Sequence, residues 1–168
     1  RLMVIDRAGG KISHDVFKNI GVHLPKKSLI ILNDSKVVPV RLWGEREGTR
    51  GKVEIFLLEK LPGGGGQSYK AMIRPLKRLK AGEKIIFPGQ KIYARIEDPL
   101  KRIVSFNTKK FEPHLEKFGH MPLPPYIKRM DEPVDREYYQ TVYAKKKGSV
   151  GICPGLLIFL EKNYSPLA

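Results

Sequence analysis

Residues 52–61, KVEIFLLEKL, place Val53, Ile55 and Leu57 on one face of an extended segment. This alternation is typical of a strand with one buried face. Four segments of similar texture follow along the chain: Tyr69–Ile73, Lys84–Phe87, Ile92–Ile96 and Arg102–Phe106. Runs rich in glycine and proline separate them at close spacing, as hairpin turns do. The pattern predicts a small antiparallel β-barrel, followed by a short helix over Phe111–Phe118 that ends at Gly119.

Two short apolar runs precede the barrel segments. Leu2–Ile5 and Ser28–Leu32 are too short for helices and too continuous for half-exposed strands, so both are predicted to be buried strands. Between them a short helix is predicted, with Ser13 as its cap and Gly21 as its end. A strand, a helix and a second strand in this order predict a parallel pair of strands in an α/β unit.

The second apolar run ends in four polar residues, Asn33, Asp34, Ser35 and Lys36. Open α/β sheets build their sites at the carboxyl ends of buried strands. This is therefore the most site-like position in the sequence.

Charge is the strongest compositional signal. The 168 residues contain 32 Lys and Arg against 17 Asp and Glu, a net charge of +15. Residues 41–110 hold 17 basic and 7 acidic residues, a net +10. Such an excess favours a polyanionic partner, and the alternative is a solvated lysine-rich surface.

Other features of the composition bound the class of protein. The chain has no apolar run of about 18 residues and no signal peptide at its start, which predicts a soluble cytoplasmic protein without a membrane partner. The single Cys153 argues against a disulfide or a zinc cluster, so no metal and no cofactor are expected. The chain begins with Arg1 and stops without closing a periodic pattern, and we interpret it as a fragment of a longer, monomeric protein.

Three strings carry a resemblance to a known family. Residues 33–42, NDSKVVPVRL, resemble the signature Asn-Asn/Asp-Thr-Arg-Val-Ile-Pro-Ala-Arg-Leu. Residues 119–127, GHMPLPPYI, and the run YQTVYA at 139–144 with GSV at 148–150 are similar to two further segments of the same family. By these strings the chain resembles the S-adenosylmethionine:tRNA ribosyltransferase-isomerases of queuosine biosynthesis over about residues 1–150.

The resemblance implies an α/β catalytic domain, incomplete in this chain, interrupted by an inserted antiparallel β-barrel. We assign residues 1–41 to the first part of the catalytic domain, 42–120 to the barrel and 121–168 to the return, with the tail 151–168 uncertain. The implied reaction transfers and isomerises the ribosyl moiety of S-adenosylmethionine onto 7-aminomethyl-7-deazaguanine at the wobble position of tRNA. It gives epoxyqueuosine, adenine and methionine, with S-adenosylmethionine as a consumed substrate rather than a cofactor.

The sequence departs from the family after Val150. There the family continues Ala-Ala-Pro-Thr-Ala-Gly-Leu-His-Phe, and this chain reads GICPGLLIF, without the threonine and the histidine. The family's second half is also missing, so the fragment is expected to be inactive alone. Two alternatives stay open: a non-enzymatic basic RNA-binding β-barrel module, and a misread coding sequence in which a frameshift ends the resemblance at Val150.

The resemblance suggests roles for individual residues. Asp34 is the candidate catalytic carboxylate, with an Asx-turn at the strand end as the structural alternative. Candidates for substrate binding, each with packing or an ordinary surface position as the alternative, are Asn33, Lys36, Arg41, Tyr126, Tyr139, Gln140 and Tyr143. The densest basic run, predicted to grip the tRNA backbone, is Arg74, Lys77, Arg78 and Lys80.

Overall fold

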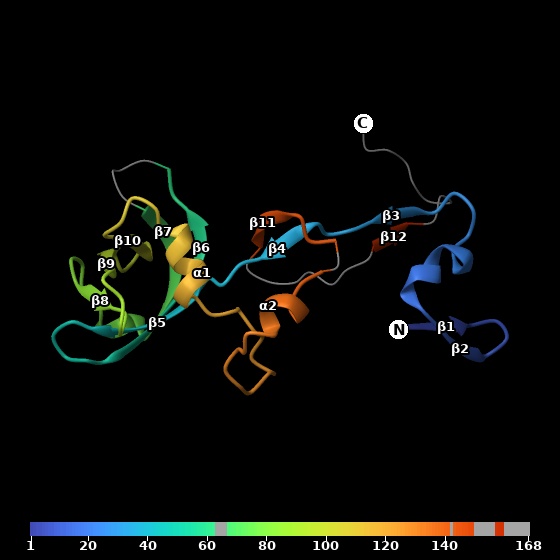
Figure 1. The fold of residues 1–168 in the computed structure, drawn as a ribbon, viewed down its shortest axis with the longest axis horizontal. Helices are drawn as coiled ribbons and strands as arrows, with labels where there is room; N and C mark the ends of the chain where they lie inside the picture. Colours follow the sequence, from blue (N-terminus) through green and yellow to red (C-terminus); the bar gives the residue numbers. More distant parts are fainter. Residues whose placement is uncertain (63–66, 142, 150–156, 160–168) are drawn as a thin grey trace. The chain divides into compact units, whose positions relative to one another are not determined.

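The computed structural model describes residues 1–62, 67–141, 143–149 and 157–159 (Figure 1). These residues form two compact units. The larger unit contains residues 33–149 with the gaps just given, and the smaller contains residues 1–32 and 157–159.

Six antiparallel strands of the larger unit close into a barrel in the order β10-β7-β6-β5-β8-β9 (Figure 1). Their bounds are β5 Arg41–Arg46, β6 Lys52–Lys60, β7 Gln67–Arg74, β8 Lys84–Ile86, β9 Tyr93–Asp98 and β10 Ile103–Phe106. The predicted barrel is therefore confirmed, and the five strands predicted for it lie within about two residues of their expected bounds.

The barrel interior is filled by the side chains that the alternation placed on one face. Val53, Ile55 and Leu57 of β6 are at most 2% exposed. Phe106 of β10 stacks on Phe111, with 3.5 Å between the ring centroids. Each such side chain contributes roughly 1.5–3 kcal/mol when it is fully buried.

Helix α1, Glu112–Phe118, packs against this core. Phe111 and Leu115 are buried, and Phe118 packs against the core from the next turn. A helix of seven residues is too short to be stable alone, so this apolar face holds it in place. The predicted helix and its end at Gly119 are confirmed.

The rest of the larger unit is built around one short parallel pair of strands. Strand β4, Ser35–Val37, pairs with β11, Lys146–Ser149, and α2 spans Asp135–Tyr138. A second small core holds Val37, Met121 and Leu123, with Ile127 and Tyr139 packed against it.

The smaller unit differs from its prediction. Strand β1, Leu2–Asp6, pairs with β2, Lys11–Asp15, as an antiparallel hairpin, and β3, Leu29–Ile31, pairs antiparallel with β12, Leu157–Phe159. Within the described residues β1 and β3 are not paired, so the predicted parallel pair is wrong. The strands are also not buried, since Met3 and Ile5 are 59% and 57% exposed.

The predicted helix from Ser13 to Gly21 is also wrong, because Ser13 lies in β2 opposite Val4. A 3₁₀ helix, η1, Phe17–His23, follows instead. The Asp15 carboxylate accepts hydrogen bonds from the Val16 amide and the Asn19 side chain, and it lies 2.7 Å from His23. The contact with His23 is the main cause that lowers the pKa of Asp15, followed by the other two hydrogen bonds.

Because neither the parallel pair nor the helix between its strands is found, the α/β character of a catalytic domain stays a prediction.

Candidate functional site

The β4–β11 pair brings two of the family strings together. The backbone carbonyl of Asp34 accepts hydrogen bonds from the amides of Lys145 and Lys146, at 2.7 and 3.1 Å. Beyond it Ser35 faces Lys146 in the parallel register. Residues more than a hundred positions apart in the chain are thereby adjacent in the fold.

The turn before β4 is made by Asn33. Its side-chain oxygen accepts a hydrogen bond from the Ser35 amide at 2.9 Å, which is an Asx-turn. The structural alternative considered for Asp34 thus belongs to its neighbour. A substrate-binding role for Asn33 stays a prediction, and its oxygen already has a partner.

The Asp34 carboxylate is left accessible. Its side chain is 46% exposed and lies 3.8 Å from the Lys146 ammonium group, which is itself 83% exposed. An ion pair this long between exposed groups contributes little to stability. The carboxylate can therefore exchange Lys146 for a substrate at small cost.

Gln140 holds strand β4 from the side. The Val37 amide donates to Gln140 Oε1 at 2.9 Å, and Gln140 Nε2 donates to the Val37 carbonyl at 2.8 Å. The side-chain amide therefore bonds to the backbone of Val37 in the way that a neighbouring strand would. Substrate binding, the predicted role of Gln140, would have to compete with these two hydrogen bonds, for example in a contact with an RNA base edge.

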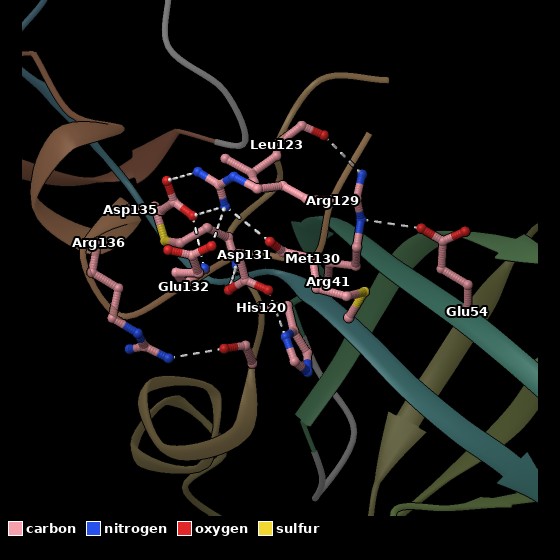
Figure 2. Close-up of polar contacts among 12 residues, drawn as sticks. Arg41, Glu54, His120, Leu123, Arg129, Met130, Asp131, Glu132, Asp135 and Arg136 are labelled. Atoms are coloured by element: carbon pink, nitrogen blue, oxygen red, sulfur yellow. Dashed lines mark hydrogen bonds and ion pairs between the residues drawn. The ribbon is translucent and has the colours of Figure 1, made fainter. Parts of the chain in front are cut away.

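Arg41 begins β5 and reaches across to the Pro-rich segment. Its Nη2 donates to the Leu123 carbonyl at 3.3 Å, and its Nε lies 3.1 Å from Glu54 Oε1 (Figure 2). The guanidinium also lies over the Phe56 ring, 5.5 Å from its centroid. The charge of Arg41 is thus largely balanced within the protein.

The other predicted substrate residues occupy different environments. Tyr126 is 80% exposed, Lys36 is exposed, and Tyr143 is half-buried. Tyr139 packs against the second core. Of the predicted residues, Asn33 and Asp34 directly precede β4, Lys36 lies in it, and Gln140 is hydrogen-bonded to its last residue.

Residues 119–136 contain a polar network that the sequence patterns did not predict. His120 Nδ1 lies 2.7 Å from Asp131 Oδ1, and Asp131 Oδ2 accepts the Met121 amide at 2.8 Å (Figure 2). The backbones of His120 and Arg41 are bonded to each other at 3.2 and 2.8 Å. The His120 side chain is 35% exposed, and its Nε2 makes no hydrogen bond within the described residues, an arrangement that suits proton transfer. The eleven-residue separation gave no local signal of this pair.

The same segment is held by two arginines. Arg129 makes a bidentate pair with the buried Asp135, at 2.6 and 2.8 Å, and Glu132 donates its amide to the same carboxylate (Figure 2). The hydrogen bonds from Arg129, followed by the Glu132 amide, lower the pKa of Asp135 to about 2. Arg136 donates to the carbonyls of Glu116 and Gly119 and so caps α1.

The basic run predicted for the tRNA backbone follows β7. Arg74 ends that strand, Lys77 lies in the 3₁₀ helix η2, Leu76–Arg78, and Lys80 comes after it; all three are exposed. The side chain of Arg78 lies outside what the structure describes. A tRNA contact by these residues stays a prediction.

Two kinds of feature are absent from the described residues. No three His, Cys, Asp or Glu side chains in this part of the chain are grouped so that they could hold a metal ion. No helix in the described ranges is long and apolar enough to cross a bilayer.

Comparison with known proteins agrees with the resemblance seen in the strings. A family model described as "Queuosine biosynthesis protein" matches residues 1–167. The chain is 40% identical over 166 residues to the S-adenosylmethionine:tRNA ribosyltransferase-isomerase of Caldanaerobacter subterraneus subsp. tengcongensis, covering 96% of this chain and 47% of that protein. It is also 40% identical over 152 residues to the protein of the same name from a Sulfurihydrogenibium species, covering 89% and 44%.

Among solved structures, the S-adenosylmethionine tRNA ribosyltransferase of Thermotoga maritima is 26% identical, with a TM-score of 0.37 over 74% of this chain and 43% of that one. The chain spans about half the length of the curated relatives it matches. The family match runs past Val150 to residue 167, so the expected end of the resemblance at Val150 is wrong. Apart from residues 157–159, the tail 151–168 lies outside the described residues.

Proposed function

Because this chain belongs to the queuosine biosynthesis protein family, we propose that it supplies part of the catalytic machinery of an S-adenosylmethionine:tRNA ribosyltransferase-isomerase. The reaction takes the ribosyl moiety of S-adenosylmethionine and isomerises it onto 7-aminomethyl-7-deazaguanine at the wobble position of tRNA. Epoxyqueuosine, adenine and methionine are the products, and S-adenosylmethionine is consumed. The protein acts in the cytoplasm as a monomer, and the chain has no turnover alone.

The observation that carries this proposal is the β4–β11 junction. It joins the string at residues 33–42 to the string at 139–150, and it leaves the Asp34 carboxylate accessible beside the exposed Lys36. The reaction needs a base that removes a proton beside the sulfonium centre of the donor. Asp34 has the chemistry for this step, and a carboxylate free of structural hydrogen bonds can approach a cationic sulfonium without breaking the fold.

The remaining candidates fit binding roles. Lys36 can hold the donor carboxylate or an RNA phosphate. Tyr126 and Tyr143 can stack on adenine or on a base. Arg41 is already paired with Glu54, so its part in substrate binding would be through the Arg41–Glu54 pair as a unit.

The test is adenine release from S-adenosylmethionine on addition of tRNA that carries the deazaguanine precursor. In a full-length protein with these residues, Asp34→Asn is expected to reduce turnover about a hundredfold or more, the usual scale for a general base. The matched control is Asp98→Asn, an aspartate whose carboxylate accepts the Lys101 amide in a barrel turn. Both variants should melt like the parent, because neither side chain is buried.

The outcomes separate the competing functions. A fully active Asp34→Asn variant would reject the role of Asp34 and leave the family reaction intact. Failure of the full-length protein to release adenine would reject the reaction itself and favour the non-enzymatic RNA-binding module.

A further inference from the structure

On the outer face of β5, β6 and β7, side chains lie in two rows that run across the three strands, and each row is called a rung. The residues next to them along each strand point into the core. The first rung is Arg41, Phe56 and Met72, and the second is Trp43, Glu54 and Arg74. The alternating residues Leu42, Ile55 and Ile73 are buried. The two rungs therefore face outward, with Trp43 41% exposed and Met72 38% exposed.

A cavity of about 230 Å³ opens on these rungs. Residues 122–125 of the Pro-rich segment line it on one side, and the residues that line it from the barrel are Arg41, Glu54, Phe56, Met72 and Arg74. Its volume lies below the roughly 300–1,000 Å³ of pockets for drug-sized ligands. It suits a single flat ring better than a whole cofactor.

The charges around the cavity leave one cation free. Arg41 is paired with Glu54, so these two contribute little net charge. Arg74 is exposed and makes no side-chain hydrogen bond or ion pair within the described residues. Neighbouring strands lie about 4.8 Å apart, so Arg74 and Trp43, two strands from each other on one rung, are separated by about 10 Å. An aromatic surface, an apolar slot and one free guanidinium thus lie within reach of adjoining nucleotides.

We propose that this outer face is a stacking platform for unpaired RNA. One base stacks on Trp43, a neighbouring base enters the cavity against Phe56, and Arg74 holds the phosphate of the backbone that joins them. Aromatic side chains interleaved with cations are the features that bind single-stranded nucleic acid, whereas the bases of a duplex are stacked on each other and cannot reach such a surface. The net charge of +10 over residues 41–110 favours RNA over a protein partner.

The inference rests on the proposed function, because the wobble position lies in the unpaired anticodon loop of tRNA. It goes further by assigning the loop nucleotides to the barrel. It also gives Trp43 a role that the resemblance to the family did not suggest.

Trp43 is the single tryptophan of the chain, so its fluorescence reports on this face alone. The 168-residue chain is titrated with a single-stranded oligoadenylate and with an RNA duplex of the same length. We expect saturable quenching with the single strand and little change with the duplex. Binding is followed in parallel by the anisotropy of labelled RNA.

Variants separate stacking from charge. Trp43→Leu should lower the affinity for the single strand about tenfold, within the range reported for loss of one stacked base, and Trp43→Phe should retain most of it. Arg74→Gln should weaken binding and lower the salt slope by about one. The matched control is Arg95→Gln, an exposed cation on the outside of β9, which should behave like the parent.

Three results would overturn the platform. The first is RNA binding that leaves the Trp43 emission unchanged, and the second is a Trp43→Leu variant that binds the single strand with the affinity of the parent. The third is an emission that changes with protein concentration in the absence of RNA, which would assign the face to a second copy of the chain. None of these results affects adenine release by a full-length protein, so the platform can fail while the proposed reaction stands.

Discussion

Replacement of Gly119 by alanine is a sharp test of how the barrel is joined to the segment that follows it. Gly119 has φ −71° and ψ 148°, a conformation that any residue can adopt. A β-carbon on it, however, would lie 2.1 Å from the carbonyl oxygen of Pro39 and 2.5 Å from that of Leu115. Ordinary contacts begin at 3.4 Å, so the backbones must separate by about 1 Å or more. The Arg41–His120 backbone pair next to it would be strained as a result.

Both clashing atoms belong to the backbone and cannot rotate away. Overpacking typically costs about 1–3 kcal/mol, and we expect Gly119→Ala to lie at about 3 kcal/mol. For a chain of this size that lowers the melting temperature by roughly 6–12 °C. The matched control is Gly48→Ala, because a β-carbon on Gly48 meets no atom within 4 Å; it should shift stability by less than about 0.5 kcal/mol. Thermal and urea unfolding, followed by Trp43 fluorescence, measure both variants. Equal midpoints for the two would refute the close approach.

Two further predictions concern the polar contacts around the site. Gln140→Met should lower the free energy of unfolding by about 1–3 kcal/mol, measured in urea, because it removes the side-chain partners of the amide and the carbonyl of the buried Val37. Unchanged stability together with weaker RNA binding would instead support a contact between Gln140 and an RNA base. Asp135 has its pKa lowered from 3.8 to about 2, so the stability it contributes is present above pH 3.8 and is lost as the pH falls toward 2. The difference in urea midpoint between the parent and Asp135→Asn should therefore shrink over this range, and a difference that does not vary with pH would contradict the Arg129 pairing.

The barrel could be predicted because its strands have one buried and one exposed face. In β6 the alternation of Val53, Ile55 and Leu57 is regular enough to fix both the element and its inner side. Residues 42–46 were assigned to the barrel, but β5 was not predicted as a strand, because Gly44 occupies an inward position where the other strands have an apolar side chain. A β-carbon on Gly44 would lie 2.6 Å from the Ile85 side chain of the neighbouring strand β8. Ile85 therefore fills the space that a side chain at position 44 would otherwise occupy.

The smaller unit was mispredicted for a different reason. Ser13 is followed three residues later by apolar side chains, a pattern that fits the start of a helix as well as the end of a strand. Over so few residues, the 3.6-residue period of a helix cannot be told from the two-residue period of a strand. The reversal between β1 and β2 decides the matter, with the Ala8 amide bonded to Asp6 and Gly10 at φ +64°. The contact between Val37 and Gln140 spans 103 positions, and no local pattern could reveal it.

The signature strings combine structural and chemical duties, and the structure separates them residue by residue. Asn33 makes the turn before β4 and Gln140 clamps the strand, so the fold already accounts for both side chains. Asp34, Lys36 and Tyr126 belong to the same strings, yet the only side-chain hydrogen bond or ion pair found for them among the described residues is the 3.8 Å contact of Asp34 with Lys146. A polar side chain that the fold does not need is available to a ligand at little cost in stability. Substitutions of Asp34, Lys36 and Tyr126 should therefore affect substrate binding or turnover while leaving the unfolding midpoint near that of the parent. Substitutions of Asn33 and Gln140 should act mainly on stability.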